Sequence, residues 1–193
     1  MLSVLNELEI GKVIIGKQGK ESEQYALFRK IVDEKEIPVI VVKQGNIINI
    51  EKHLKIKILF PEDELITENV LNNNSLVFKL EYQRFEMLFT GDIEEVAEKQ
   101  LLKMYSNGEL KADVLKVAHH GSKSSTTEEF IKLVNPKIAL IGVEKENSYG
   151  HPNNEVIERL EKYGAKIYRT DIYGEIRIKI NKKGIYDIKT HIE

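Results

Sequence analysis

The sequence contains no cysteine among its 193 residues. It therefore can form no disulfide and offers no thiolate to a metal, so a bound ion must be held by His, Asp, Glu, Asn or water. The usual sequence indicator of redox compartment is missing for the same reason. These absences restrict the chemistry of any metal site before a motif is considered.

Long hydrophobic runs are also missing, and the apolar stretches fall far short of the roughly 20 residues that cross a bilayer. Residues 1–8 lack the basic region and cleavage site of a signal peptide. They place Leu2, Leu5 and Leu8 at the spacing of an amphipathic helix. The formal net charge of −2 argues against tight, unspecific binding to nucleic acid through bulk charge, although a local basic patch is compatible with it.

The composition, 41% hydrophobic and 31% charged, is ordinary for a soluble globular protein. No repeat, low-complexity segment or linker divides the chain, so residues 1–193 are interpreted as a single domain. The hydrophobic periodicity predicts helices at residues 2–8, 21–36, 93–105, 128–134 and 154–163, and strands at residues 12–15, 39–42, 46–50, 55–60, 75–82, 85–89, 113–118, 137–143, 166–169, 175–180 and 185–189. This mixed order of α and β segments favours two sheets covered by helices over one doubly wound parallel sheet.

Three short polar segments each follow a predicted strand and open a loop, where functional groups usually lie. They are Thr90-Gly91-Asp92, His119-His120-Gly121-Ser122 and Tyr149-Gly150-His151-Pro152. Asp92 with Glu95 three residues later resembles a capping box at a helix start. The same carboxylate could instead bridge two cations. From spacing alone, the cap and the bridging ligand have about equal weight.

The histidine segments are equally ambiguous when each is considered alone. Adjacent residues at a strand end point in opposite directions, so at most one of His119 and His120 would face a given site. The other would pack or hydrogen-bond behind it. Ser122 could act as a nucleophile only if a base reached it. His151 precedes a proline and Asn153 is a good N-cap, so this segment has a simple interpretation as a turn that leads into a helix.

Taken together and in this order, the segments resemble the C-terminal metallo-β-lactamase-like domain of the ComEC family of DNA-uptake proteins. The resemblance is carried by LFTGD at 88–92, DVLKVAHHGSKSS at 113–125 and SYGHP at 148–152. NNNSLV at 72–77 and YRTD at 168–171 support it. The match runs through roughly residues 2–180, and the combined motif is highly specific.

The resemblance implies an α/β fold, a four-layer αββα sandwich. In this family a cluster of His and Asp at one edge of the two sheets holds one or two divalent metals, Zn or Mn. These metals activate water to cut a phosphodiester. The resemblance makes Asp92 the bridging carboxylate and His151 a late metal ligand, with either His119 or His120 facing the metal.

The resemblance also implies DNA as the substrate and partner. The residues expected to bind the substrate around the site are Asn74, Ser75, Ser122, Lys123 and Tyr149. Many members of the wider superfamily place another histidine near Asn74 or Ser75, so this chain departs from them there.

The larger departure is at the start, where the family's His-x-x-x-Asp-His motif would directly precede a stretch like residues 2–15. No histidine precedes His53. We therefore expect an N-terminally truncated domain that binds metal weakly or not at all and has no appreciable nuclease activity. Truncation also predicts an exposed strand edge at residues 13–15, and hence a homodimer through residues 1–20. The alternative is that a strand near residues 185–188 covers this edge.

Three interpretations of function remain open. The first is a ComEC-like hydrolase that processes DNA during uptake, as part of a membrane-embedded parent. The second is a stand-alone, cytoplasmic hydrolase of a small phosphodiester or a lactone. The third is a non-catalytic remnant that binds a partner. An in-frame His-x-x-x-Asp-His upstream of Met1 would favour the first two, and long hydrophobic spans before it would favour the first.

Overall fold

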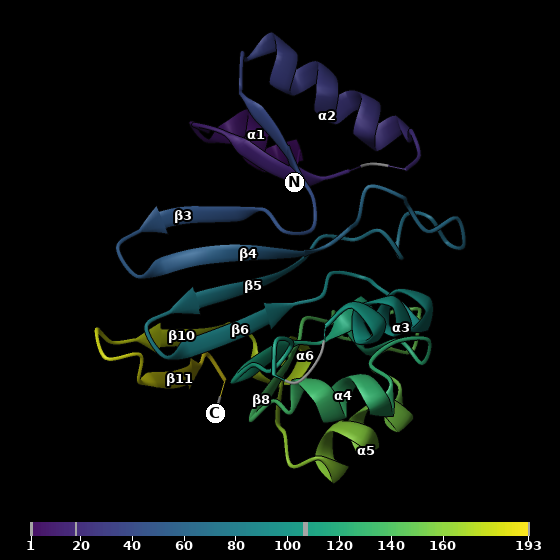
Figure 1. Ribbon diagram of the computed structural model, residues 1–193, viewed down its shortest axis with the longest axis vertical. Coiled ribbons are helices and arrows are strands. Elements are labelled where there is room, and N and C mark those ends of the chain that lie inside the picture. Colours follow the sequence, from purple (N-terminus) through teal and green to yellow (C-terminus); the bar gives the residue numbers. More distant parts are fainter. Residues whose placement is uncertain (1, 18, 106–107, 193) are drawn as a thin grey trace.

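A seven-stranded mixed sheet forms the centre of the protein (Figure 1). The computed structural model describes residues 2–17, 19–105 and 108–192. In spatial order the strands are β3 (Ile47–Glu51), β4 (Leu54–Phe60), β5 (Val77–Tyr82), β6 (Phe85–Phe89), β7 (Val114–Lys116), β8 (Ile138–Ile141) and β9 (Lys166–Arg169). Strands β3 to β6 pair antiparallel, whereas β6 to β9 pair parallel. The carboxyl ends of β6, β7 and β8 therefore lie at one edge of the sheet, and all three polar motifs follow these strands.

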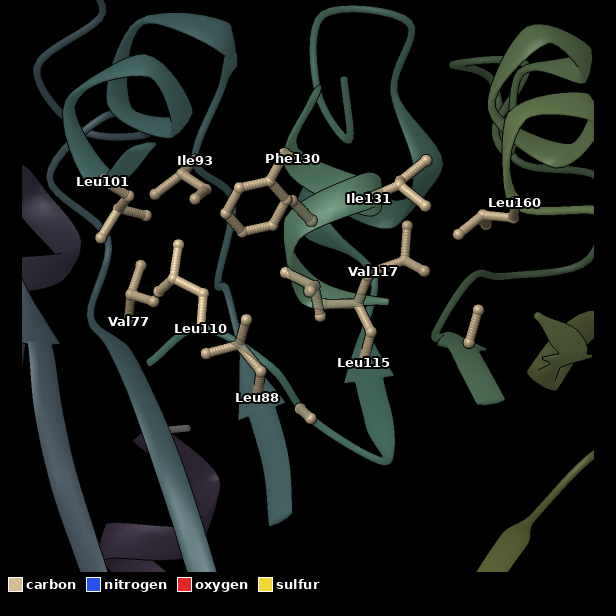
Figure 2. Packing of buried hydrophobic residues seen from close by; sticks show 14 of the residues in the cluster. Val77, Leu88, Ile93, Leu101, Leu110, Leu115, Val117, Phe130, Ile131 and Leu160 are labelled. Atoms are coloured by element: carbon tan, nitrogen blue, oxygen red, sulfur yellow. The ribbon is translucent and has the colours of Figure 1, made fainter. Parts of the chain in front are cut away.

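Three helices cover one face of this sheet and bury the main core against it (Figure 2). They are α3 (Glu95–Met104), α4 (Glu128–Val134) and α5 (Asn154–Lys162). Leu88 and Leu115 project from the strands toward Leu101, Phe130 and Leu160 of the helices, and all five are almost fully buried. Burial of a side chain of this size stabilises a fold by roughly 1.5–3 kcal/mol. The core therefore lies directly under the loops that carry the motifs.

A small second sheet packs on the opposite face. It consists of the antiparallel strands β10 (Ile176–Ile180) and β11 (Tyr186–Thr190), which follow the short helix α6 (Thr170–Tyr173). Phe85 of the large sheet contacts Tyr186 edge-on, with 5.3 Å between the ring centroids. The order of layers is thus helices, large sheet and small sheet. The mixed α/β class predicted from the sequence is confirmed, and the layers are consistent with an αββα sandwich.

An N-terminal unit with a core of its own lies beyond β3 (Figure 1). It comprises α1 (Leu2–Glu7), β1 (Val13–Gly16), α2 (Glu23–Glu34) and β2 (Val39–Val42). Strands β1 and β2 form a separate parallel sheet, and the two helices contact each other. Leu5, Phe28, Ile31 and Val32 form its buried core cluster, and Val42 of β2 is buried as well.

The strand edge predicted at residues 13–15 is only partly exposed. These residues are half-buried, because β1 pairs with β2 along one side and faces the helices. Within the described ranges, β1 and β2 are the only strands of this sheet. The alternative that residues 185–188 cover this edge is wrong, since β11 pairs with β10. Among the described residues, we find no helix whose length and apolar character would let it cross a bilayer.

Candidate functional site

Asp92 lies in a tight turn directly after β6. Thr90 Oγ1 donates a hydrogen bond to the Lys116 carbonyl at 2.6 Å, and the Asp92 backbone N–H donates to Ser75 Oγ at 3.1 Å. Gly91 has a φ of +54°, and a Cβ at this position would lie 2.6 Å from the Ser75 Cβ. Only glycine fits there without strain. The turn therefore places the Asp92 carboxylate at the sheet edge with 44% of its side chain exposed.

The capping-box interpretation of Asp92 is wrong. Helix α3 begins at Glu95, and its N-cap is Glu94, whose side chain makes no capping hydrogen bond. Asp92 thus stands two residues before the cap. Helix capping does not explain why the sequence has a carboxylate at position 92.

The two adjacent histidines lie in η1 (Ala118–Gly121), a short turn that begins two residues after β7 ends. Both have left-handed backbone conformations, with φ of 46° at His119 and 55° at His120. Such a conformation costs a non-glycine residue on the order of 1–3 kcal/mol, and it persists where the surroundings impose it. Here the His119 N–H donates to the Gly91 carbonyl at 3.0 Å. Strand alternation, on which the opposite orientation of the two rings was predicted, does not apply to this turn.

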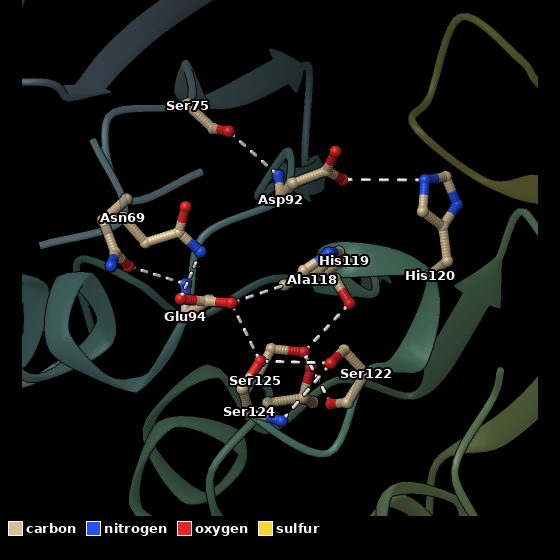
Figure 3. Close-up of polar contacts among 12 residues, drawn as sticks. Asn69, Ser75, Asp92, Glu94, Ala118, His119, His120, Ser122, Ser124 and Ser125 are labelled. Atoms are coloured by element: carbon tan, nitrogen blue, oxygen red, sulfur yellow. Dashed lines mark hydrogen bonds and ion pairs between the residues drawn. The ribbon is translucent and has the colours of Figure 1, made fainter. Parts of the chain in front are cut away.

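The structure brings the four predicted metal-site residues together as two contacting pairs. His120 Nε2 lies 3.8 Å from Asp92 Oδ1 (Figure 3). The rings of His119 and His151 meet edge-on, with 5.8 Å between their centroids. Within the ranges that the structure describes, no three His, Asp or Glu side chains converge closely enough to hold a metal ion.

His151 is held on the loop after β8 by Asn147. The Asn147 amide donates to the His151 carbonyl at 2.7 Å and accepts from the His151 N–H at 3.0 Å. Burial holds the pKa of the His151 imidazole below its ordinary value, and the nearby His119 and His120 lower this pKa further. This shift favours the neutral imidazole, which is the form that binds metals. Asn153 caps α5, as predicted, through the Glu155 N–H at 3.0 Å.

Two of the predicted substrate-binding residues support loops beside the site, Ser75 the Asp92 turn and Asn74 the loop at residues 66–70. Ser75 Oγ accepts from the Asp92 N–H, as described above. Asn74 is buried, and its amide donates to the carbonyls of Ile66 and Val70 and accepts from the Ile66 N–H. Both amide hydrogens of Asn74 are thus used to hold a loop. Its contact with a substrate stays a prediction, and these bonds argue against it.

The other three predicted substrate-binding residues lie around the histidines. Ser122 Oγ lies 3.1 Å from Ser124 Oγ. Lys123 forms an exposed ion pair with Glu155 at 2.7 Å. Tyr149 is 81% exposed, and its ring stacks on His151 with 5.9 Å between centroids. Of the three, Tyr149 presents the largest surface to a ligand.

Three charged residues near the site were missed by the sequence reasoning. Glu94 Oε1 lies 3.5 Å from His119 Nδ1, and Glu98 is buried beneath the loop after η1. Both lie in an acidic run of the kind that is common in a first helical turn. The sequence therefore gives no reason to single them out as site residues. Lys116 looks like an ordinary strand residue, but burial lowers the pKa of its ammonium, and the nearby Asp92 opposes this shift.

The sequence is related to proteins of bacterial competence. It is 37% identical over 156 residues to ComE operon protein 3 from Bacillus subtilis. This alignment covers 80% of this chain and 20% of that protein. It is 32% identical over 114 residues to competence protein ComA from Neisseria gonorrhoeae, covering 59% of this chain and 16% of that protein. It is 32% identical over 125 residues to recombination protein 2 from Haemophilus influenzae. That alignment covers 65% of this chain and 15% of that protein.

The resemblance stated from the motifs is confirmed: over the matched residues the chain is similar in sequence to these competence proteins. It corresponds to about a fifth or less of the length of these relatives. No protein-family model matches the chain. A solved structure from Parabacteroides distasonis, named as a candidate metal-dependent hydrolase, aligns with a TM-score of 0.49 and 13% identity over 83% of this chain and 64% of that one. At that level the alignment adds nothing to the sequence comparison.

Proposed function

We propose that these residues supply part of a divalent-metal site that hydrolyses phosphodiester bonds of DNA during uptake. The observation that carries the proposal is the meeting of three polar motifs at one edge of the sheet. Asp92, the pair His119 and His120, and His151 follow three neighbouring strands, and they contact one another in two pairs. This is the edge at which open α/β sheets commonly bind ligands.

The chemistry of these residues fits a divalent ion, whereas their number falls short. Imidazole nitrogen and carboxylate oxygen are ligands that Zn²⁺ and Mn²⁺ accept. The buried His119 Nδ1 has no hydrogen-bond partner and faces Glu94 Oε1 at 3.5 Å. The sequence nevertheless has no His-x-x-x-Asp-His. Asp92, His151 and one further histidine give about three ligands, where a closed zinc site takes about four.

With a divalent ion bound, the groups around the site would suit a phosphodiester substrate. A bound divalent ion would lower the pKa of water and stabilise charge at the attacked phosphorus. The chain itself contributes the Asp92 carboxylate, the imidazole of His151, whose lowered pKa favours the neutral form, and the half-buried amino group of Lys116. Tyr149 and Lys123 form the exposed rim, on which a DNA backbone or base could lie.

A DNA-cleavage assay with Mn²⁺ or Zn²⁺ tests the proposal on two forms of the protein. One is the 193-residue chain, and the other carries a His-x-x-x-Asp-His segment fused before Leu2. We expect cleavage from the extended form alone. In that form Asp92→Ala should abolish cleavage, whereas Asp187→Ala should not, because Asp187 is exposed on β11.

Circular dichroism of each variant separates loss of activity from loss of fold. Equal cleavage by the short and extended forms would refute the need for the motif. Full activity of a folded Asp92→Ala variant would refute the site itself.

A further inference from the structure

His120 and His119 both place Nδ1 next to an oxygen atom. For His120 this oxygen is the carbonyl of Gly142, which can only accept a hydrogen bond. The His120 Nδ1 therefore carries the proton in the neutral ring. Its Nε2 is left with a lone pair, and this is the nitrogen that lies 3.8 Å from Asp92.

For His119 the neighbouring oxygen belongs to Glu94. The His119 Nδ1 is buried and lies 3.5 Å from Glu94 Oε1, slightly beyond ordinary hydrogen-bond distance (Figure 3). The two side chains are only 24% and 18% exposed, so water competes weakly for either. An ionised carboxylate can only accept, so it favours a proton on the facing nitrogen.

The Glu94 carboxylate is held in this position by residues from separate loops. Asn69 Nδ2 donates to Oε2 at 2.9 Å, and Ser124 Oγ donates to Oε1 at 3.1 Å. The Glu94 backbone N–H donates to Asn73 Oδ1 at 3.0 Å. A carboxylate fixed at both oxygens is preorganised to hold a neighbouring ring in one orientation.

We propose that Glu94 is a positioning residue that sets the tautomer of His119: it keeps the proton on Nδ1 and leaves Nε2 as the nitrogen with a free lone pair. Both histidines of the motif would then offer Nε2, one oriented by a backbone carbonyl and the other by a carboxylate. The inference deepens the proposed function, because it states how one of the proposed ligands is prepared. It concerns the ring in the metal-free protein.

Glu94 also has a simpler structural role. It is the N-cap residue of α3, where a negative charge interacts favourably with the helix dipole. That role stabilises the helix but leaves the protonation pattern of His119 unchanged. The tautomer is therefore the readout that separates the two roles.

Long-range ¹H–¹⁵N correlation spectra of the metal-free protein measure this tautomer, at a pH well above the ordinary pKa of histidine. The signals of His119 are identified by their loss in His119→Gln. In the wild-type protein we expect the proton of His119 on Nδ1. Glu94→Ala should move it toward Nε2, whereas Glu94→Gln keeps an oxygen acceptor and should retain most of the Nδ1-protonated form.

Glu95→Ala is the matched control, because Glu95 is the next residue and forms an exposed pair with Lys99. It should leave the His119 spectrum unchanged. A proton on Nε2 in the wild type, or an unchanged tautomer in a folded Glu94→Ala variant, would overturn the inference. If Glu94→Ala fails to fold, the wild-type and Glu94→Gln spectra still decide. Because no metal or DNA is present, this result and the DNA-cleavage result can fail independently.

Discussion

The N-terminal unit and the layered body around the large sheet differ sharply in how well they bury their apolar residues. The main core joins strands and three helices through a continuous buried cluster. Among its described residues, the N-terminal unit buries only the apolar side chains of Leu5, Phe28, Ile31, Val32 and Val42. It leaves Leu27, Ile40 and Val41 at 45%, 43% and 60% exposed. We infer that the layered body sets the stability of the protein, and that the N-terminal unit opens at a lower free energy.

This difference bears on function because every candidate site residue lies on the layered body. Asp92, His119, His120 and His151 follow strands of the large sheet. Their loops are tied to one another by bonds such as Thr90 to Lys116. The site should therefore keep its geometry when the N-terminal unit opens, and the following predictions test this division from the largest expected effect to the smallest.

Phe130→Ala should have the largest effect, because its ring is buried where α4 meets the sheet. We expect the free energy of unfolding to fall by about 3–5 kcal/mol. Amide hydrogen exchange should accelerate together across β6, β7 and β8. Leu27→Ala serves as the control and should cost less than about 0.5 kcal/mol, since Leu27 is largely exposed.

Ile31→Ala removes a buried side chain from the N-terminal unit instead. The local cost should be about 2–4 kcal/mol. We expect faster hydrogen exchange confined to residues 2–42, with exchange in β6, β7 and β8 unchanged. If protection were lost equally in both regions, the two would form one cooperative unit.

Glu98→Gln tests how the loop after η1 is supported. Glu98 Oε2 accepts from the Thr127 N–H at 2.8 Å and from Thr127 Oγ1 at 2.7 Å, and Oε1 accepts from the Thr126 N–H. In the glutamine variant the side-chain NH₂ group would replace one of the two oxygens. It would then face a threonine N–H or O–H group, which would lose its acceptor. The substitution should therefore cost about 1–3 kcal/mol.

Glu98 should also give the protein a pH dependence that Glu98→Gln removes. Burial raises the pKa of this carboxyl above its ordinary value of 4.5, against the opposing hydrogen bonds from Thr127 and Thr126. Between the ordinary and the raised pKa the folded protein binds more protons than the unfolded chain. Binding of this proton therefore adds to the free energy of unfolding. The added stability is fully present below pH 4.5 and is lost as the pH rises through the pKa that Glu98 has in the folded protein. Urea titrations across this range measure the slope, and exposed Glu158→Gln should keep it.

The smallest effect concerns association through the N-terminal unit. Within the described ranges, the side of residues 13–15 that faces away from β2 has no strand partner. We expect a dimer in light scattering at micromolar concentration, and Ile14→Lys should shift it toward monomer because edge lysines oppose strand pairing. Ile50→Lys on β3 is the control. A monomeric wild-type protein would contradict this prediction.

The sequence predicted most elements, because their hydrophobic periodicity reflects local burial. The strand predicted at residues 113–118 shows where this reasoning fails, since β7 ends at Lys116 and the chain turns into η1. The left-handed pair His119 and His120 depends on a bond to Gly91, a residue distant in sequence. For the same reason the contact between Glu94 and His119 could not be predicted from the spacing of residues.

Metal binding by the 193-residue chain tests most directly the central claim that Asp92 and the histidines form part of a metal site. After dialysis we expect much less than one equivalent of bound ion. Calorimetric titration with Zn²⁺ or Mn²⁺ should then show weak binding that Asp92→Ala removes and Asp187→Ala preserves. A stoichiometric ion that survives dialysis, or binding that Asp92→Ala leaves unchanged, would contradict the account.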